Sequence, residues 1–269
     1  MSPEARKGVG GEGARTAERA DSLTAVILAA GSGTRLKGRL SGMERIPKTL
    51  LTIKGHSLME RMVKDLQDVS AEGVYIVTGF REEKIKKHAA ELAVKYELHI
   101  ELVGNKDYAT TNTGFSLLLA LDKIDGGDVI ILNGDVIYDR AIFEGVVNRR
   151  GTCLAIDDVK ELTEESFKII TRSGRIAAIG KELPLDKAIG EYMGIAKIRE
   201  SDCGRVRSIL RLLVSIDQMV YYDVAFKELS HQRPIDFLFT AGRKWTEIDF
   251  VEDFEYAEEI AGEIDRSRW

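Results

Sequence analysis

Residues 25–35 read Ala-Val-Ile-Leu-Ala-Ala-Gly-Ser-Gly-Thr-Arg, and Pro47-Lys48 follows twelve residues later. The first four residues form a continuous apolar run, which is typical of a strand buried on both faces. The small residues after it allow a ligand to approach the backbone closely, and their successive N–H groups suit an anion. Arg35 and Lys48 add positive charges that match phosphate oxygens, and Pro47 restricts the backbone before Lys48. The stretch predicts a strand that ends in a turn binding a nucleoside triphosphate.

Two other kinds of phosphate-binding loop do not fit this stretch. A Walker P-loop is excluded because no Gly-Lys-Ser/Thr closes the turn, and a dinucleotide fingerprint is excluded because Gly-x-Gly-x-x-Gly is missing. The remaining alternative is a tight strand-loop connection with two solvated basic residues.

Composition indicates a folded chain with a sizeable core. Of its 269 residues 44% are hydrophobic and 31% are charged, and the net charge is -5. An acidic balance argues against broad nucleic-acid binding but leaves room for a local basic pocket. Cys153 and Cys203 lack CxxC spacing, so we expect two reduced thiols in a cytoplasmic protein.

Neither a membrane span nor a secretory leader is expected. No apolar run approaches the ~20 residues that cross a bilayer, and residues 1–22 lack the apolar core of a signal peptide. We predict that residues 1–22 form a flexible tail.

Strands alternate with helices through the first half of the chain. The patterns predict strands over 25–28, 74–78, 99–103 and 128–133, and helices over 57–68, 82–96 and 114–121. This alternation indicates crossover units and a mainly parallel sheet. Ligands collect beyond the carboxyl ends of strands in such sheets. Gly31, Gly79 and Asp135 each follow a predicted strand, so we expect all three in one crevice.

Shorter elements follow residue 150. Strands are predicted over 152–157, 168–171, 175–180, 193–197 and 244–249, with a hairpin turn at 173–174, one or two helices within 202–229 and a closing helix over 251–261. Neither a repeat nor a Pro/Ser-rich linker interrupts the chain. We therefore predict one domain over 23–262, with a nucleotide-binding half at about 23–150 and an acceptor-binding half at about 151–262.

Two aspartates are candidate magnesium ligands. Asp135 and Asp249 each stand at the end of a predicted strand. Mg²⁺ prefers one or two carboxylates together with water and substrate phosphates. Taken alone, each residue is better explained as a turn former or a helix cap, but the Gly-rich loop upstream favours a ligand role for Asp135.

Leu28-Ala-Ala-Gly-Ser-Gly-Thr-Arg35 with Pro47-Lys48 resembles the motif of the nucleotidyltransferases that activate sugar phosphates and phospho-alcohols. The resemblance covers about residues 24–260 and implies a three-layer α/β/α Rossmann-like (GT-A-like) fold with a mainly parallel mixed sheet. It also implies that Asp135 and Asp249 bind Mg²⁺. The nucleotide would contact the turn and the glycine after the next strand, which are Leu28, Ala29, Ala30, Gly31, Ser32, Gly33, Thr34 and Gly79.

A second segment points to the nucleotide. Residues 105–108 and 111–117 resemble the corresponding region of cytidylyltransferases that act on phospho-alcohols, including inositol-1-phosphate and phosphocholine enzymes. The Gln and Pro-Gly or Gly-Thr-Ala motifs of hexose-phosphate enzymes are missing. Short polar side chains at the expected helix start would donate to phosphate or base oxygens, or would simply cap the helix; they are Thr111, Asn112, Thr113 and Ser116.

A third segment points to the acceptor. Residues 175–183 and 190–194 resemble the acceptor-side segment of inositol-1-phosphate cytidylyltransferases, in which Lys181 would approach the acceptor phosphate. Lys168 would assist or would be a solvated strand lysine. Glu191 would bind acceptor hydroxyls or would be an exposed turn carboxylate.

The resemblance implies transfer of CMP from CTP to inositol 1-phosphate with release of pyrophosphate. Arg35 would hold the β- and γ-phosphates, Lys48 the α-phosphate and Lys181 the acceptor, and the basic loop 35–46 would be a lid or a plain solvated loop. The alternatives are a hexose-1-phosphate nucleotidyltransferase using UTP, dTTP or GTP, a phosphocholine or molybdenum-cofactor cytidylyltransferase, and a nucleotide-binding regulatory subunit. We expect a monomer or homodimer, with a separate membrane-bound phosphotransferase as downstream partner.

Overall fold

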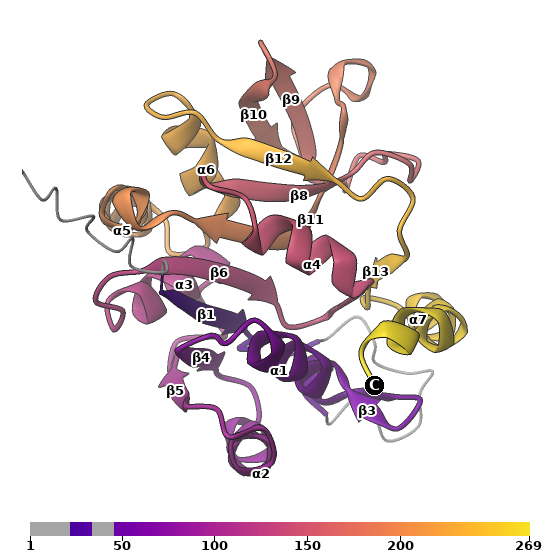
Figure 1. Cartoon of the computed structure of the whole chain (residues 1–269). Helices are drawn as coiled ribbons and strands as arrows, with labels where there is room; N and C mark the ends of the chain where they lie inside the picture. Colours follow the sequence, from indigo (N-terminus) through magenta and orange to yellow (C-terminus); the bar gives the residue numbers. More distant parts are fainter. Residues whose placement is uncertain (1–21, 34–45) are drawn as a thin grey trace, which may run out of the picture.

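A nine-stranded sheet forms the centre of the molecule. The computed structural model describes residues 22–33 and 46–269 (Figure 1). Its strands run in the order β10-β9-β11-β6-β1-β4-β5, and β8 joins β12 to β11. The strand bounds are β1 (Leu23–Leu28), β4 (Gly73–Thr78), β5 (Ile100–Gly104), β6 (Asp128–Asn133), β8 (Cys153–Asp157), β9 (Lys168–Arg172), β10 (Arg175–Gly180), β11 (Gly190–Ile198) and β12 (Asp236–Phe239).

Strand direction divides the sheet. The β5-β4-β1-β6 half is wholly parallel. Strand β11 runs antiparallel to β6, β8 and β9, and β10 runs antiparallel to β9. It follows that β10 and β11 oppose the other strands, so the predicted mainly parallel mixed sheet is confirmed.

Helices cover both faces of the sheet and complete three layers. One face packs against α1 (Leu58–Asp68), α2 (Glu82–Tyr96) and α4 (Arg140–Val147). The other packs against α3 (Thr113–Leu121), α5 (Glu200–Ile216) and α6 (Asp223–Ser230). Residues of β1 alternate between the two cores, since Ile27 joins one and Val26 the other. This two-sided burial explains the apolar run of the sequence.

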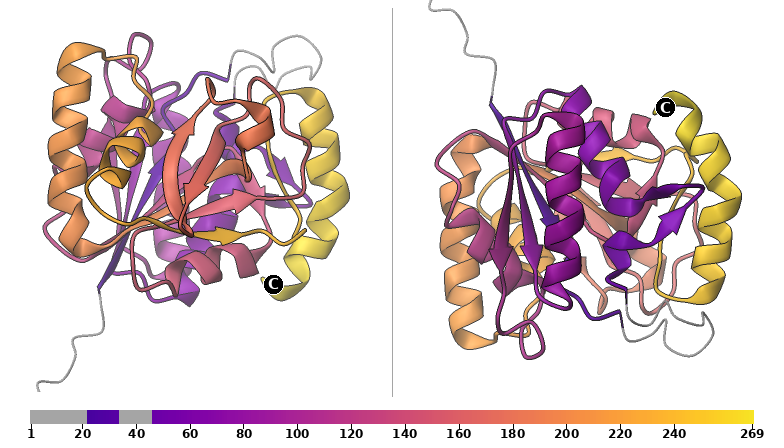
Figure 2. Two further views of the ribbon diagram at one scale, coloured as in Figure 1. Left: turned by 90° about the horizontal axis from the view of Figure 1, so that it is seen from above. Right: turned by 90° about the horizontal axis from the view of Figure 1, so that it is seen from below.

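A third, smaller core lies beside the sheet. It joins α7 (Val251–Ile264) to the hairpin of β2 (Thr52–Ile53) and β3 (His56–Ser57). Both views in Figure 2 place α7 on the opposite side of the molecule from α5. The short 3₁₀ turns are η3 (Lys48–Leu50), η4 (Leu185–Lys187) and η5 (Asp265–Ser267).

Most predicted elements have the expected type and place. The helix over 82–96 and the strand over 175–180 match their observed bounds, whereas β11 extends over 190–198 and α7 continues to residue 264. The sequence interpretation missed the β2–β3 hairpin, β7 (Val136–Tyr138), α4 and β12. These elements are short, and most of them follow the preceding element closely. Their apolar residues are therefore too few to show a helical or strand periodicity.

A two-stranded ribbon stands apart from the main sheet. Strand β7 pairs antiparallel with β13 (Trp245–Glu247), in the register Val136 opposite Glu247. The amide of Ile248 also donates to the carbonyl of Asp135 at 2.9 Å. Two segments more than a hundred residues apart in sequence are thereby fixed side by side at the end of β6.

An ion pair anchors the end of the chain beneath this ribbon. The guanidinium of Arg268 donates to both carboxylate oxygens of Asp65 at 2.8 and 2.9 Å and to the carbonyl of Tyr138 at 3.1 Å. Both charged side chains are almost fully buried. The Trp269 ring stacks on His56 with 3.9 Å between centroids. The anchor ties α1 to the end of β7.

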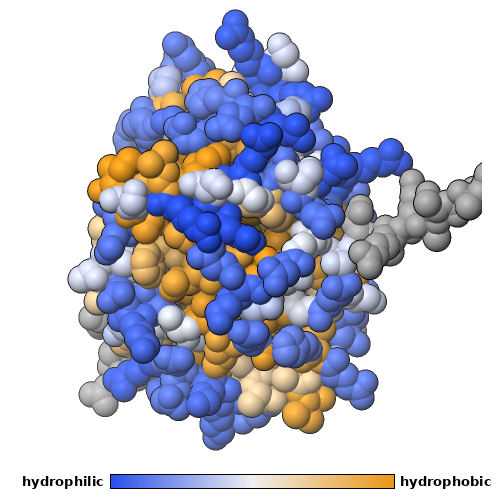
Figure 3. All heavy atoms as spheres, turned by 90° about the vertical axis from the view of Figure 1, so that its left-hand side faces the viewer, coloured by the Kyte–Doolittle hydropathy of each residue, from blue (hydrophilic) through white to orange (hydrophobic). Residues whose placement is uncertain are grey.

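The described part of the chain contains no helix that is both long and apolar enough to cross a bilayer. Its exposed apolar side chains include Leu212, Ile216 and Met219, in and just after α5. Figure 3 views the side of the molecule that carries α5 and shows apolar atoms gathered among hydrophilic ones.

Whether the protein is a monomer or a homodimer stays a prediction.

The buried anchor should make a large contribution to stability. We expect Arg268→Met to lower the free energy of unfolding by about 3–5 kcal/mol, because it leaves the Asp65 charge buried without its partner. Urea denaturation measures this loss. Arg211→Met is the matched control, since the Arg211–Asp122 pair is exposed and should be worth less than about 1 kcal/mol. Equal losses in the two variants would contradict the assignment.

Candidate active site

Three carboxylates converge where β6 meets the β7–β13 ribbon. Asp135 follows β6, Glu247 ends β13, and Asp249 comes two residues later. Each offers an oxygen within 4.8 Å of the others. The ammonium of Lys48 donates to Asp135 at 2.9 Å and also to Asp249. The structure thus brings together Lys48, Asp135 and Asp249, which the sequence had predicted as site residues.

The charges of this cluster perturb one another. The negative charges of Asp135 and Asp249 raise the pKa of Glu247 to about 8. Burial alone would lower the pKa of Lys48, but the two aspartates outweigh it and raise that pKa. Carboxylate oxygens are ligands that Mg²⁺ takes in proteins, and the cluster offers more than the one or two carboxylates that such an ion usually uses. The residues present therefore fit a divalent cation.

Glu247 is a member of this cluster that sequence reasoning did not assign. It stood inside the motif that contains Asp249, but only the aspartate was predicted as a ligand. Side chains two residues apart on an extended strand point the same way. That period would have placed Glu247 beside Asp249.

A cavity of about 210 Å³ opens beside the carboxylates. The end of β1 contributes Leu28 to its lining, and the turn after it contributes Ala30 and Gly31. The region around the start of α3 contributes short polar side chains and Tyr108. These lining residues are Asn105, Tyr108, Thr111, Asn112, Thr113 and Ser116. All four predicted polar residues around this helix start therefore reach the same cavity as the turn.

Several of these polar groups also have structural hydrogen bonds. Asn112 is the N-cap of α3, and its side chain accepts from the Thr113 amide at 2.8 Å. The amide of Asn105 donates to the hydroxyls of Thr111 and Ser116 at 3.0 Å each. The helix-capping alternative thus holds for Asn112, while Thr111 and Ser116 are held in place by Asn105.

A smaller cavity of about 80 Å³ lies on the other side of the turn. Its lining includes Ala29, Gly33, Lys48 and Asp135. Gly33 has a positive φ of +58°, and a Cβ there would lie 3.1 Å from Cγ of Lys48, so this position favours glycine. Ser32 is partly buried beside it.

Thr34, Arg35 and nearly all of the basic loop 35–46 lie outside the described residues. The predicted contacts of Thr34 and Arg35 with the nucleotide therefore stay predictions.

Gly79 is not among the lining residues of the 210 Å³ cavity. A Cβ at this position would come within 2.6 Å of Cβ of Tyr108 and 2.9 Å of the carbonyl of Ala30. Glycine here lets two segments that line the cavity approach each other. Its role in the described structure is therefore one of packing.

The predicted acceptor lysines differ in their surroundings. Lys168 is fully buried, and its ammonium donates to the carbonyls of Thr163, Glu164 and Ser166 at 3.1–3.4 Å. Lys168 is not in the cavity lining and holds the segment before β9. Lys168 is therefore not a solvated strand lysine. Because its ammonium is buried and donates to three backbone carbonyls, it stabilises the fold rather than facing an acceptor.

Lys181 and Glu191 lie closer to the site. The ammonium of Lys181 pairs with Glu165 at 2.9 Å and lies 5.0 Å from the ring centre of Phe167, which lines the cavity. Glu191 is largely buried. Its Oε2 accepts no hydrogen bond from any described residue, and the ammonium of Lys160 is 3.9 Å away. The charge of Glu191 also contributes to the raised pKa of Glu247.

The far wall of the larger cavity is aromatic and acidic, which the sequence had not indicated. Its aromatic members are Phe167, Tyr192, Tyr221 and Tyr222, and Asp223 lies beside them. Burial raises the pKa of Asp223 to about 7, against the favourable charges of Lys181 and Lys227. These residues all lie after residue 150, in the half of the chain predicted to bind the acceptor.

Stability should depend on pH through Asp223. Its pKa is higher in the folded than in the unfolded state, so its contribution is present at low pH and is lost as pH rises from about 4 to about 7. Asp223→Asn cannot ionise. Relative to the native chain, this variant should gain up to about 4 kcal/mol in unfolding free energy between pH 4 and pH 8.

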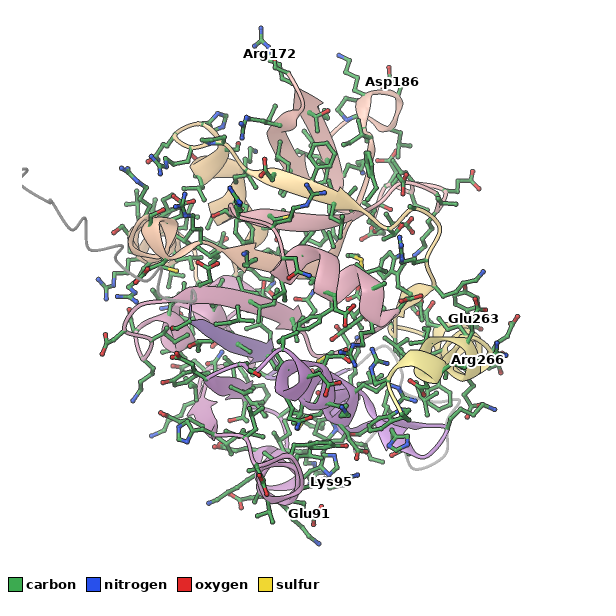
Figure 4. All side chains as sticks on the ribbon, in the orientation of Figure 1. Glu91, Lys95, Arg172, Asp186, Glu263 and Arg266 are labelled. Carbon is green, nitrogen blue, oxygen red and sulfur yellow. The ribbon has the colours of Figure 1, made fainter. Side chains whose placement is uncertain are left out.

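Chemical denaturation at several pH values measures that gain. Asp186→Asn is the control, because this exposed side chain projects from the periphery of the molecule in Figure 4 and should show no comparable pH-dependent gain. A constant difference between Asp223→Asn and the native chain at all pH values would contradict the burial argument.

Comparisons with known proteins agree with this geometry. A family model described as the MobA-like NTP transferase domain matches residues 25–162. A bifunctional IPC transferase and DIPP synthase of Aquifex aeolicus (strain VF5) is 30% identical over 235 residues, 87% of this chain and 50% of that protein. The corresponding protein of Thermococcus kodakarensis is 26% identical over 233 residues, 87% of this chain and 49% of that protein. The chain spans about half the length of these curated relatives.

Solved structures share the fold. The CTP:phosphocholine cytidylyltransferase from Streptococcus pneumoniae superposes with a TM-score of 0.72 at 23% identity, covering 89% of this chain and 99% of that one. The inositol-1-phosphate CTP transferase from T. maritima gives 0.73 at 18% identity, covering 93% and 98%. The family model, which matches more than half of the residues, and the resemblance noted in the sequence agree. This chain belongs to the nucleotidyltransferase family of the MobA-like NTP transferase domain.

Proposed function

We propose that this chain transfers CMP from CTP to a phosphorylated alcohol, with inositol 1-phosphate as the acceptor. The observation that carries the proposal is that Asp135 lines both cavities. One cavity offers short polar groups and the other offers Lys48 and the glycine turn. The base of a nucleotide would occupy the cavity with the short polar groups, and its phosphates would reach the cavity with Lys48 and the glycine turn. Its α-phosphate would then lie near the carboxylates.

The chemistry requires charge control more than acid–base catalysis. The second pKa of a phosphate monoester is about 6, so the acceptor is already largely dianionic near neutral pH. An acceptor oxygen forms a bond to the α-phosphorus of CTP, the bond from that phosphorus to the bridging oxygen breaks, and pyrophosphate leaves. The protein must align these groups and neutralise their negative charge.

The residues of the cluster would divide this task. Asp135, Glu247 and Asp249 would hold Mg²⁺, which supplies positive charge where the phosphates meet. Lys48 would shift its contacts from the aspartates to the α-phosphate. Outside the cluster, Arg35 would hold the β- and γ-phosphates.

The acceptor would lie against the far wall. Lys181 would leave Glu165 to meet the acceptor phosphate, and the bare Oε2 of Glu191 would accept from an acceptor hydroxyl. The names of the relatives support inositol phosphate, since one is an IPC transferase and one an inositol-1-phosphate CTP transferase.

Phosphocholine is the second candidate acceptor. The aromatic side chains of the far wall lie beside the carboxyl group of Asp223. Aromatic faces and carboxylates are groups that recognise a quaternary ammonium. One solved relative with the same fold acts on phosphocholine by name.

A substrate panel tests the proposal. Five nucleoside triphosphates are each combined with inositol 1-phosphate, phosphocholine, 2-aminoethylphosphonate and glucose 1-phosphate, and pyrophosphate release is measured with Mg²⁺ present. We expect the highest kcat/KM with CTP and inositol 1-phosphate. Faster turnover of UTP with glucose 1-phosphate would favour a hexose-phosphate enzyme. Tight CTP binding without any product would favour a regulatory subunit.

Variants of the cluster test the assigned roles. Lys48→Ala should lower kcat about 10²-fold, as expected for loss of one donor to the transition state. Asp135→Asn should abolish Mg²⁺-dependent pyrophosphate release while the circular dichroism spectrum stays native. Lys64→Ala serves as the control, because this lysine pairs with Asp68 on α1. Full activity of Asp135→Asn would refute the metal assignment.

A further inference from the structure

A chain of hydrogen bonds crosses from the acceptor half to the end of β6. The hydroxyl of Tyr222 donates to Oδ1 of Asn133 at 3.0 Å, and the hydroxyl of Tyr192 lies 2.6 Å from that of Tyr222. Tyr192 comes from β11, and Tyr222 from the turn before α6. Both tyrosines are more than nine-tenths buried. Asn133 itself lines the cavity beside Asp135.

This arrangement fixes which end of the Asn133 amide faces the cavity. Among the described residues, Tyr192 has no acceptor for its hydroxyl proton other than the Tyr222 oxygen. The Tyr222 oxygen therefore accepts a hydrogen bond from Tyr192, and the Tyr222 hydroxyl donates its own hydrogen bond to Oδ1 of Asn133. In the opposite orientation Nδ2 would face Tyr222, and one of the two buried hydroxyl hydrogens would be left without an acceptor. Nδ2 is thus the free end.

The backbone of β11 is shaped to admit this amide. Gly194 has a φ of +81°, and a Cβ there would lie 2.6 Å from Nδ2 of Asn133. Glycine therefore permits the close approach and the unusual backbone conformation together. No described residue accepts a hydrogen bond from Nδ2, nor is this atom sealed from solvent. A donor with a fixed direction is left for a ligand.

We propose that Asn133 is a specificity determinant that donates from Nδ2 to a hydroxyl oxygen of the acceptor and so favours a polyol phosphate over phosphocholine. The inference rests on the proposed function. A trimethylammonium group has no lone pair and cannot accept this hydrogen bond, whereas each hydroxyl of a cyclitol can. Tyr192 and Tyr222 act as positioning residues for the amide. The aromatic wall would accommodate either acceptor, so the amide adds the discrimination.

Steady-state kinetics with two acceptors tests this. Asn133→Leu keeps the approximate volume and removes the donor. We expect its KM for inositol 1-phosphate to rise about 10-fold, the effect of one lost hydrogen bond. The KM for CTP and the kcat/KM for phosphocholine should change less than about twofold. Tyr222→Phe frees the amide to turn. The ratio of kcat/KM for inositol 1-phosphate to kcat/KM for phosphocholine should therefore also fall, by about threefold.

A matched control separates this effect from general damage. Tyr75→Phe also removes a tyrosine hydroxyl, one that donates to the carbonyl of Lys123 at 3.4 Å away from the cavity, and it should leave the acceptor preference unchanged. If Asn133→Leu does not fold by circular dichroism, Tyr222→Phe carries the same test.

Two results would overturn the inference. An unchanged ratio of kcat/KM values for the two acceptors in the Asn133 and Tyr222 variants is one. A rise in the KM for CTP alone is the other, because the amide would then serve the nucleotide. Failure of the proposed function is seen separately, as native protein that turns over neither acceptor with CTP.

Discussion

The pairing of β7 with β13 is the constraint on which the site depends. It holds Asp135 beside Glu247 and Asp249, although like charges at this distance repel. Backbone hydrogen bonds, the small core under α7 and the buried Arg268–Asp65 pair stabilise the ribbon from below. Lys48 offsets part of the repulsion by contacting two of the carboxylates. The fold thus supplies the stability that a cluster of negative charge lacks by itself.

Strand direction explains why both halves of the chain reach one edge of the sheet. In the parallel half, carboxyl ends deliver the glycine turn and Asp135. Strand β11 runs the other way, with Ile195 opposite Leu132, so its beginning lies at that same edge. Glu191 and Tyr192 are therefore brought to the carboxyl end of β6, close to Asn133. A mixed sheet can build a two-substrate site in this way without a second domain.

Local sequence patterns were sufficient for much of this structure and for part of the site. The apolar run of β1, the period of α2 and the glycine turn are local features, and each predicted its element. Strand ends pointed to Asp135 and Asp249, the Pro-Lys pair pointed to Lys48, and the resemblance to a family strengthened these assignments. Lys168 was misread because its burial depends on carbonyls of a loop that no periodicity describes. The tyrosine–asparagine chain joins residues from β6, β11 and the turn before α6, so its members become neighbours only when the sheet order is known.

The far wall of the cavity shows why an acceptor site is harder to predict from sequence than a nucleotide site. Phosphates demand backbone amides and fixed cations, which leave a recognisable sequence of small and basic residues. An alcohol needs only a few directed polar groups on an otherwise apolar surface. In the proposed function those groups are Glu191 and Asn133, and the direction of the Asn133 amide is set by its tyrosine partner rather than by its own sequence context. Because Oδ1 of Asn133 already accepts a hydrogen bond from Tyr222, the amide has only its Nδ2 donor to offer to a ligand. The buried tyrosine pair thus fixes the orientation of an amide that could otherwise turn, and the fixed donor would distinguish a hydroxyl from an ammonium group.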